Sequence, residues 1–361
     1  MTENERFLRT MRYEPVDRRP LHLVGPWFDT LARWHTEGLP GDVTDVNAYL
    51  GLTPLRVVNV TGTAGLHPAF EQKVLSEDDT TVTSIDLYGR TVRNFKYQTS
   101  FPEWIDFPVK TGDDLWRLLD EHFDVSDMDS RFDAAWEERV RVATSTDCVV
   151  MLDAGCYYWT LRSLAGIEGA SYLLYDAPDA VEELFERYLA VVMEGLRRLP
   201  SLVTIDVMGF GEDIAGKNGP FMSPALFRSM ILPRYKKAME RAHEIGVEFT
   251  WHDSDGDLRL LLPDYLSIGI NGVGPCEVAA GMDPVELRRQ FGRDLRMVGG
   301  FDKRVVAQGP AAIDAEFERL RPVIVEGGYL PSIDHSVSAD ISFDNYRYFT
   351  DAVQRAILIS Q

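Results

Sequence analysis

Residues 247–277 read VEFTWHDSDGDLRLLLPDYLSIGINGVGPCE, and two apolar runs in this stretch flank a helical pattern. The first run, residues 247–253, ends in polar side chains, and the helical pattern covers residues 257–269. The second run follows at residues 270–277. A strand, a helix and a second strand in this order predict two parallel strands joined by a crossover helix.

The same alternation extends in both directions from this stretch. Each run is short and apolar, carries polar residues only at its C-terminal end, and is followed by a helical pattern; the runs cover residues 148–155, 202–213, 247–253, 270–277, 295–302 and 328–335. Strands of this kind are typical of a parallel sheet that is buried on both faces. Expected helix N-caps are Asp179, Ser223, Asp257, Asp283 and Ser342.

In the first 147 residues, the strand and helix patterns alternate less regularly than in the rest of the chain. Residues 20–27 are expected to form the first barrel strand, residues 80–97 a β-hairpin that turns at Tyr88 and Gly89, and residues 126–141 a helix. No repeat or long linker divides the chain. The sequence therefore predicts one (β/α)₈ TIM-barrel domain over residues 1–361, with an N-terminal elaboration and a β-hairpin insertion. A doubly wound open sheet is the alternative, but no GxGxxG motif opens a helix.

The charge balance limits the classes of partner. The chain has 57 Asp and Glu against 37 Lys and Arg, a formal net charge of −20. Such a charge repels phosphate backbones and anionic lipid surfaces, so neither nucleic acid nor a membrane is an expected partner. No segment approaches the ~18 to 20 apolar residues of a membrane span. A cytoplasmic protein with reduced thiols is expected, since Cys148, Cys156 and Cys276 are few and widely spaced.

Ionisable or aromatic side chains follow the predicted strands, and in a parallel barrel the chemistry takes place at these strand ends. Asp213 and Asp253 stand at such positions. The candidate catalytic residues are Glu212, His252, Asp255 and His335, and the candidate substrate-binding residues are His22, Trp27, Asp153, Lys217, Lys303 and Arg304. Each one alone is also explained as a capping or solvated side chain. So many in succession favour a site.

A divalent metal needs three or four ligands from several strands. His252, Asp255, Glu277 and His335 could supply a mixed nitrogen and oxygen set. A hydrogen-bonded network that lines a polar pocket is the alternative. Strand alternation sends the side chains of His252 and Asp253 to opposite faces, so one of the two is expected to point away from the site.

Four segments resemble the uroporphyrinogen decarboxylase superfamily: NERFLRTMRYEPVDRRPLHLVGPW (4–27), YWTLRSLAGIEGASYLLYDAPDAVEELFERYL (158–189), GEDIAGKNGPFMSPALFRSMILPRYKKAMERAHEIG (211–246) and GGYLPSIDHSVSADISFDNYRYF (327–349). The resemblance implies a (β/α)₈ barrel that commonly dimerises. The superfamily includes porphyrinogen decarboxylases, corrinoid-dependent methyltransferases and, more distantly, cobalamin-independent methionine synthase. Fold alone does not choose among these activities.

At two places the sequence departs from the patterns of the superfamily, and these departures narrow the choice among its activities. The decarboxylases carry an arginine-rich segment after the first strand, but here GPWFDTLARWHTEGLP (25–40) has only Arg33 and His35 as basic residues. The methyltransferases hold zinc through an HxCG segment, where this chain has Asp253 and Asp255 or, in the other alignment, His252 and Ser254. His335 stands where the relatives have a later cysteine. Zinc or another divalent metal would therefore have harder ligands here.

Three functions remain open. The first is a methyltransferase that moves a methyl group from a small O- or N-methylated compound to a corrinoid carried by a partner protein; Trp27, Trp34, Trp159 and Trp251 would line its pocket or the core. The second is a metal-free lyase or decarboxylase of a small carboxylic acid, held by Lys303 or Arg304. The third is a barrel that binds a tetrapyrrole or corrinoid without catalysis. The resemblance favours the methyltransferase branch.

Overall fold

The computed structural model describes residues 1–97 and 101–358. Within these residues the central sheet has seven strands, every neighbouring pair of which is parallel, in the order β1-β6-β7-β10-β11-β12-β13. The strands are β1 (Val57–Asn59), β6 (Val149–Gly155), β7 (Val207–Gly211), β10 (Phe249–Asp253), β11 (Gly272–Gly274), β12 (Arg296–Phe301) and β13 (Tyr329–Ile333). Each of the six predicted runs contains one of them. The α/β barrel-like fold is therefore confirmed, with β1 as a strand that the pattern did not predict.

The predicted first strand, residues 20–27, does not form a regular strand, and this corrects the prediction. The segment is extended and bonds at both edges of the sheet: Leu55 N donates to Leu21 O (2.6 Å), and Val337 N donates to Gly25 O (3.1 Å). Pro20 and Pro26 have no N–H group, so neither end of the segment can donate to a neighbouring strand at these positions. We call this segment the seam; it spans the gap between the chain before β1 and the chain after β13.

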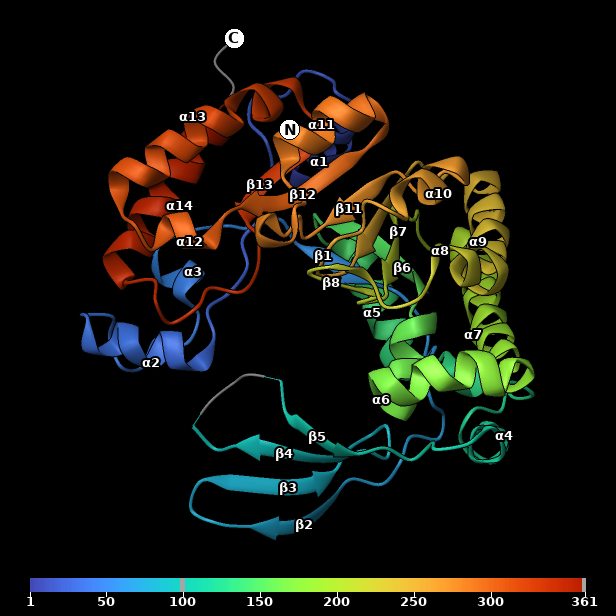
Figure 1. Ribbon diagram of the computed structural model, residues 1–361. Helices are drawn as coiled ribbons and strands as arrows, with labels where there is room; N and C mark the ends of the chain where they lie inside the picture. Colours follow the sequence, from blue (N-terminus) through green and yellow to red (C-terminus); the bar gives the residue numbers. More distant parts are fainter. Residues whose placement is uncertain (98–100, 359–361) are drawn as a thin grey trace.

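Helices follow the strands and lie around the outside of the sheet (Figure 1). They are α1 (Glu3–Met11), α2 (Phe28–Thr36), α3 (Val46–Tyr49), α4 (Gly112–His122), α5 (Ala134–Ser145), α6 (Tyr157–Asp176), α7 (Pro178–Arg198), α8 (Pro224–Leu226), α9 (Leu232–Glu244), α10 (Leu262–Ser267), α11 (Pro284–Phe291), α12 (Lys303–Val306), α13 (Pro310–Glu326) and α14 (Phe343–Ile357). None of the helices in the described residues is long and apolar enough to cross a membrane.

The helix starts confirm part of the capping prediction. The side chains of Ser223, Asp283 and Ser342 each accept a hydrogen bond from a backbone N–H of the first turn that follows. Asp179 and Asp257 are not N-caps: α7 already begins at Pro178, and α10 begins only at Leu262. The helix expected at 126–141 likewise begins later, at Ala134, because the Asp133 side chain accepts from Trp136 N (3.0 Å) and caps it there.

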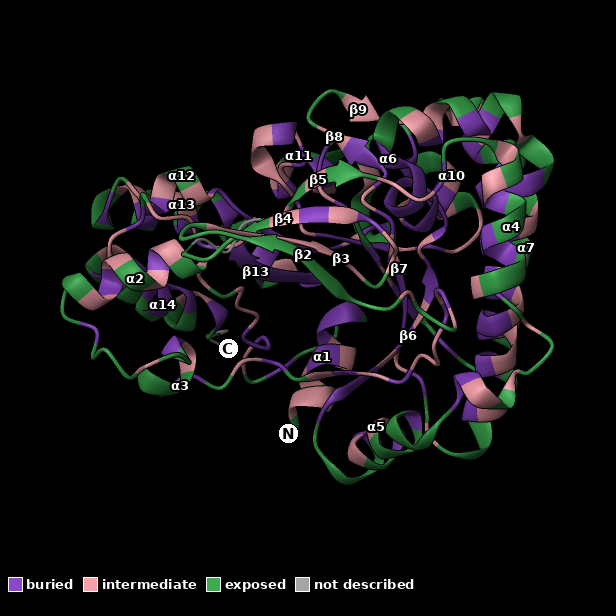
Figure 2. Cartoon of the chain, turned by 90° about the horizontal axis from the view of Figure 1, so that it is seen from below, coloured by how far each residue is buried: buried purple, intermediate pink, exposed green. Residues whose placement is uncertain are grey.

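The predicted hairpin is present and belongs to a larger insertion. Strands β2 (Lys73–Glu77), β3 (Thr81–Ile85), β4 (Thr91–Phe95) and β5 (Glu103–Asp106) form an antiparallel sheet beside α6 (Figure 1). Trp104 of β5 packs edge-on against Trp159 of α6, with ring centroids 6.4 Å apart. Figure 2 shows exposed residues along β2, in contrast to the buried residues of β6 and β7. The insertion therefore adds a wall beside the barrel rather than core.

Candidate functional site

A cavity of about 630 Å³ lies at the C-terminal ends of the strands. The seam, β10, β12 and β13 or the loops that follow them supply most of its walls, and residues before β5 cover one side. The lining residues are His22, Val24, Trp27, Phe101, Pro102, Asp213, Trp251, Asp253, Asp255, Pro275, Val298, Gly299, Ile333, His335 and Ser336. None of these is Lys or Arg. The cavity therefore combines aromatic walls with acidic groups.

Four aspartates converge at this end of the barrel, and we call Asp153, Asp213, Asp253 and Asp255 the acid group. Asp153 stands on β6, Asp213 follows β7, and the other two stand at and after the end of β10. A smaller hollow of about 250 Å³ adjoins the cavity, and Asp153, Asp253 and Trp251 line it. A Cβ atom on Gly209 would overlap with the Asp153 carboxylate, so glycine at this position makes room for it.

The two upstream members of the acid group are held by neighbours. Asn59 Nδ2 donates to Asp153 Oδ2, and burial raises the pKa of Asp153 while this hydrogen bond opposes the rise. Arg162 Nη2 lies 3.3 Å from Asp213 Oδ2 and forms an ion pair with it. Asp213 has a φ of 42°, a left-handed conformation that is strained for a residue other than glycine. The fold therefore holds the Asp213 carboxylate in place at a cost in backbone conformational energy.

Asp253 is open to the cavity, but the barrel surrounds it. Partial desolvation by the surrounding protein raises its pKa to about 7, and the negative charges of Asp213, Asp255 and Asp153 contribute to the same shift. In the described part of the chain Asp253 forms no ion pair. Near neutral pH this carboxyl group therefore exchanges between its protonated and its charged form.

Replacement of Asp253 by Asn is expected to stabilise the protein at alkaline pH. The folded protein keeps the Asp253 proton up to about pH 7, whereas the unfolded chain loses it near pH ~4. Stability is therefore lost as the pH rises through this window, and Asn removes the loss. The melting temperature of Asp253→Asn should exceed that of the wild type by roughly 1 to 2 °C at pH 8 and match it near pH 4. Equal melting temperatures of the variant and the wild type at pH 8 would contradict the raised pKa of Asp253. The control is Asp42→Asn, at an exposed loop position.

Asp255 and His335 form a pair at the cavity wall. His335 Nε2 lies 3.3 Å from Asp255 Oδ2, and this hydrogen bond raises the pKa of His335 above its usual value. The charge of Glu277 adds to the rise, while burial and the charge of Lys303 oppose it. Trp27 meets the His335 ring edge-on at 5.7 Å between centroids. The imidazole is therefore oriented on two sides and can carry a proton at neutral pH.

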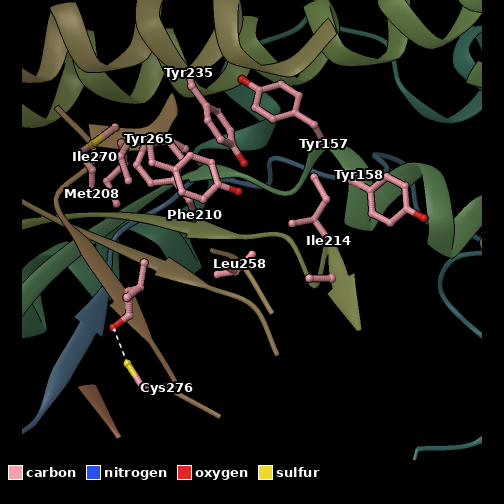
Figure 3. Packing of buried hydrophobic residues seen from close by; sticks show 14 of the residues in the cluster. Tyr157, Tyr158, Met208, Phe210, Ile214, Tyr235, Leu258, Tyr265, Ile270 and Cys276 are labelled. Carbon is pink, nitrogen blue, oxygen red and sulfur yellow. Dashed lines mark hydrogen bonds between the residues drawn. The ribbon is translucent and has the colours of Figure 1, made fainter. Parts of the chain in front are cut away.

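His252 does not belong to this site, which corrects the prediction. Its side chain is fully buried on the other face of β10, where it stacks on Tyr265 with ring centroids 4.4 Å apart. Phe210 and Tyr235 complete this aromatic environment, and Figure 3 shows them with Tyr265 between the sheet and the helices. Burial lowers the pKa of His252 to about 3, so the ring is neutral.

The predicted metal set therefore does not assemble. Glu277 also lies outside the cavity lining, and its Oε2 accepts from Gly256 N at 2.9 Å. Among the described residues, no group of three or more His, Cys, Asp and Glu side chains has the arrangement of a metal site. The residues present do not fit zinc, since its sites use three or four converging ligands. The acid group and the Asp255–His335 pair form a polar pocket, the alternative that the sequence left open.

Glu212 is an anchor of the fold rather than a cavity residue, which also corrects the prediction. The carboxylate is fully buried and accepts hydrogen bonds from four backbone N–H groups, those of Cys156, Tyr157, Tyr158 and Trp159, and from Tyr235 Oη. Burial raises the pKa of Glu212, and these donors oppose the rise. The carboxylate ties the start of α6 to the end of β7. It thereby places the next residue, Asp213, at the cavity.

The predicted basic residues lie apart from the cavity lining. Lys217 is exposed in the turn between β8 (Ala215–Gly216) and β9 (Gly219–Pro220). Arg304 pairs with Asp302 at 2.7 Å, and the Lys303 N–H group donates to Asp334. His22 and Trp27 do line the cavity, and His22 packs against Trp251 at 5.4 Å between ring centroids.

Sequence reasoning missed Asn59 as part of the site and left Trp251 open as a pocket or a core residue. Asn59 ends β1, a three-residue strand that the hydrophobic pattern did not predict, so its position at a strand end was hidden. Trp251 stands in the middle of an apolar run and was interpreted as core or pocket. It lines both the cavity and the smaller hollow, and its Nε1 donates to Gly274 O (3.3 Å). Cys276 is fully buried, and burial raises its pKa to about 12, so its thiol does not serve as a nucleophile.

Comparisons with known proteins agree with this architecture. A methyltransferase from Methanosarcina mazei has a similar structure over 98% of this chain and 99% of its own, with a TM-score of 0.63 and 16% identity. A protein from Listeria monocytogenes, described as a vitamin-B12 independent methionine synthase, aligns over 94% of this chain and 98% of its own with a TM-score of 0.39 and 10% identity. No curated protein matches in sequence. The uroporphyrinogen decarboxylase (URO-D) family model matches residues 156–356, more than half of the chain. The chain therefore belongs to the uroporphyrinogen decarboxylase family.

Proposed function

We propose that this protein transfers a methyl group from a small O- or N-methylated compound to a corrinoid held by a partner protein. The observation that carries the proposal is the Asp255–His335 pair at the wall of an open, aromatic cavity. A cavity of about 630 Å³ has the size of a small-molecule site. The family membership and the structural likeness to a methyltransferase also support methyl transfer as the activity.

Methyl transfer from a neutral alcohol, ether or amine needs a proton donor beside the departing atom. A reduced corrinoid supplies the nucleophile that takes the methyl group without its bonding electrons. The oxygen or nitrogen that loses the methyl group keeps the bonding pair and takes up a proton. His335, whose pKa is raised by its hydrogen bond with Asp255, is the group placed to give this proton. Trp27 holds the ring in the orientation that faces the cavity.

Decarboxylation of a small carboxylic acid is less compatible with this site. Such a substrate brings a second negative charge beside the acid group, and the cavity lining contains no Lys or Arg to compensate it. The basic residues that were expected to hold a carboxylate, Lys303 and Arg304, lie outside this lining. The methyl donor, in contrast, need not be an anion.

A donor panel tests the proposal. The purified protein is mixed with cob(I)alamin, the probe for the corrinoid carrier, and with methylated amines, methanol or aryl methyl ethers, and the absorbance of methylcobalamin is followed. We expect methylcobalamin to form with one class of donor, at a rate at least ~10²-fold above the protein-free mixture. Lys217→Ala, in an exposed turn, should keep that rate. Absence of methyl transfer from every donor by folded protein would overturn the proposal.

A further inference from the structure

We propose that the substrate of this cavity is a methylated ammonium cation, held between Trp251 and the carboxylates of Asp153 and Asp253. The inference rests on the proposed methyl transfer and names its substrate class. It concerns the hollow of about 250 Å³ beside the main cavity, which we call the cation pocket and which is lined by Val57, Met151, Asp153, Gly209, Phe210, Gly211, Trp251 and Asp253.

Charge is the first observation. Two members of the acid group already have cationic partners, since Asp213 pairs with Arg162 and Asp255 pairs with His335. The other two, Asp153 and Asp253, form no ion pair with any described residue, and both line the cation pocket. Two carboxylates that line one small hollow repel each other unless a proton or a cation lies between them. A positively charged ligand supplies that compensation, whereas a neutral ether does not.

The shape of the cation pocket indicates which cation fits. Apart from the two carboxylates, the residues that line it are apolar or aromatic, with Trp251, Met151 and Val57 among them. Gly209 has no side chain, and this leaves the room that the Asp153 carboxylate occupies at the edge of the pocket. Ammonium groups that carry methyl groups bind to aromatic faces and apolar walls, because their charge is spread over the methyl hydrogens. A metal ion or a primary ammonium would instead need several hydrogen-bond acceptors or ligands.

The position of the pocket also fits the reaction. Asp253 and Trp251 line both the cation pocket and the main cavity, so a ligand in the pocket lies beside the space that His335 faces. Transfer breaks one N–CH₃ bond: the methyl group goes to the corrinoid, and the nitrogen keeps the electron pair and becomes a neutral amine. Because an ammonium donor departs as a neutral amine, the transfer step itself needs no proton from His335, and the amine takes up a proton in the cavity only afterwards. The acid group would at the same time weaken the binding of zwitterions, whose carboxylate it repels.

Binding to the protein alone tests the inference without corrinoid. Calorimetric titration compares choline with 3,3-dimethyl-1-butanol, which has the same shape without the charge, and with glycine betaine, which adds a carboxylate. We expect choline to bind roughly 10-fold or more tightly than either. Asp153→Asn and Asp253→Asn should each remove most of this preference, while Lys217→Ala keeps it. Melting curves confirm that each variant is folded.

The outcomes separate this inference from the function on which it rests. Equal affinities for choline and its neutral analogue would overturn the inference, and so would a preference for choline that persists in both folded Asn variants. Methyl transfer from ethers alone would also overturn it, while the proposed methyltransferase would stand. Selective binding of choline without any methyl transfer would support the cation pocket, while the proposed function would fall.

Discussion

With a neutral O-methylated donor, whose departing oxygen needs a proton, His335→Phe is expected to lower the single-turnover rate of methyl transfer by roughly 10²- to 10³-fold while the protein stays folded. General acids contribute rate factors of this size. Phenylalanine keeps a ring beside Trp27, so the packing at 5.7 Å between centroids is largely preserved. The variant loses only the group that carries the proton. Rates measured with saturating donor and cob(I)alamin give the effect, and melting curves give the stability.

The pH profile distinguishes a proton donor from a merely structural ring. The wild-type rate should fall as the pH rises through the pKa of His335, which the hydrogen bond to Asp255 holds above its usual value. In Asp255→Asn this support is lost, so the fall should begin at a lower pH. His335→Phe should show no such fall. A His335→Phe rate equal to that of the wild type, with an unchanged profile, would exclude His335 as the donor.

Glu212→Ala is expected to destabilise the fold strongly, with a loss of roughly 3–5 kcal/mol in the free energy of unfolding. Removal of the carboxylate leaves four backbone N–H groups at the start of α6 and the Tyr235 hydroxyl without their acceptor, in a fully buried place. Urea unfolding followed by tryptophan fluorescence measures the loss.

Two further variants sharpen this measurement. Glu212→Gln keeps one oxygen acceptor, but its NH₂ group faces N–H donors, so its loss should lie between those of Glu212→Ala and the wild type. Glu240→Ala removes an exposed glutamate that is 3.9 Å from Lys236 and should cost less than ~0.5 kcal/mol. If Glu212→Ala unfolds at the same urea concentration as Glu240→Ala, the anchoring role of Glu212 is wrong.

The sequence predicted most of the barrel because its strands are apolar on both faces and its helices follow at regular intervals. β6, β7, β10, β12 and β13 are long enough to produce this pattern. β1 has only three residues and is followed by the insertion rather than by a helix, unlike the equally short β11, and the seam has an apolar composition but pairs with its neighbours only at isolated points. Composition alone therefore predicted a strand at residues 20–27 that does not form, and it missed β1.

The site was harder to predict because a strand-end position does not say which way a side chain points. Alternation separates His252 from Asp253, but only the twist of the neighbouring strands decides that Asp253 faces the cavity. Glu212 and Asp213 present the same problem, since one is fully buried and the other lines the cavity. The sequence identified the right strand ends. In both pairs, however, it favoured the residue whose side chain is buried away from the cavity, His252 rather than Asp253 and Glu212 rather than Asp213.

The seam has a consequence for how the site tolerates different ligands. It carries His22 and Trp27, yet it is attached to the sheet by scattered hydrogen bonds rather than by a ladder. Amide hydrogens on residues 20–27 should therefore exchange with deuterium sooner than those of β6 or β7, where continuous pairing protects them. The acid group stands on or directly after β6, β7 and β10, which are joined by parallel ladders. The acid group thus selects the charge of the ligand. The seam, which is held by fewer hydrogen bonds, can shift to accommodate ligands of different size.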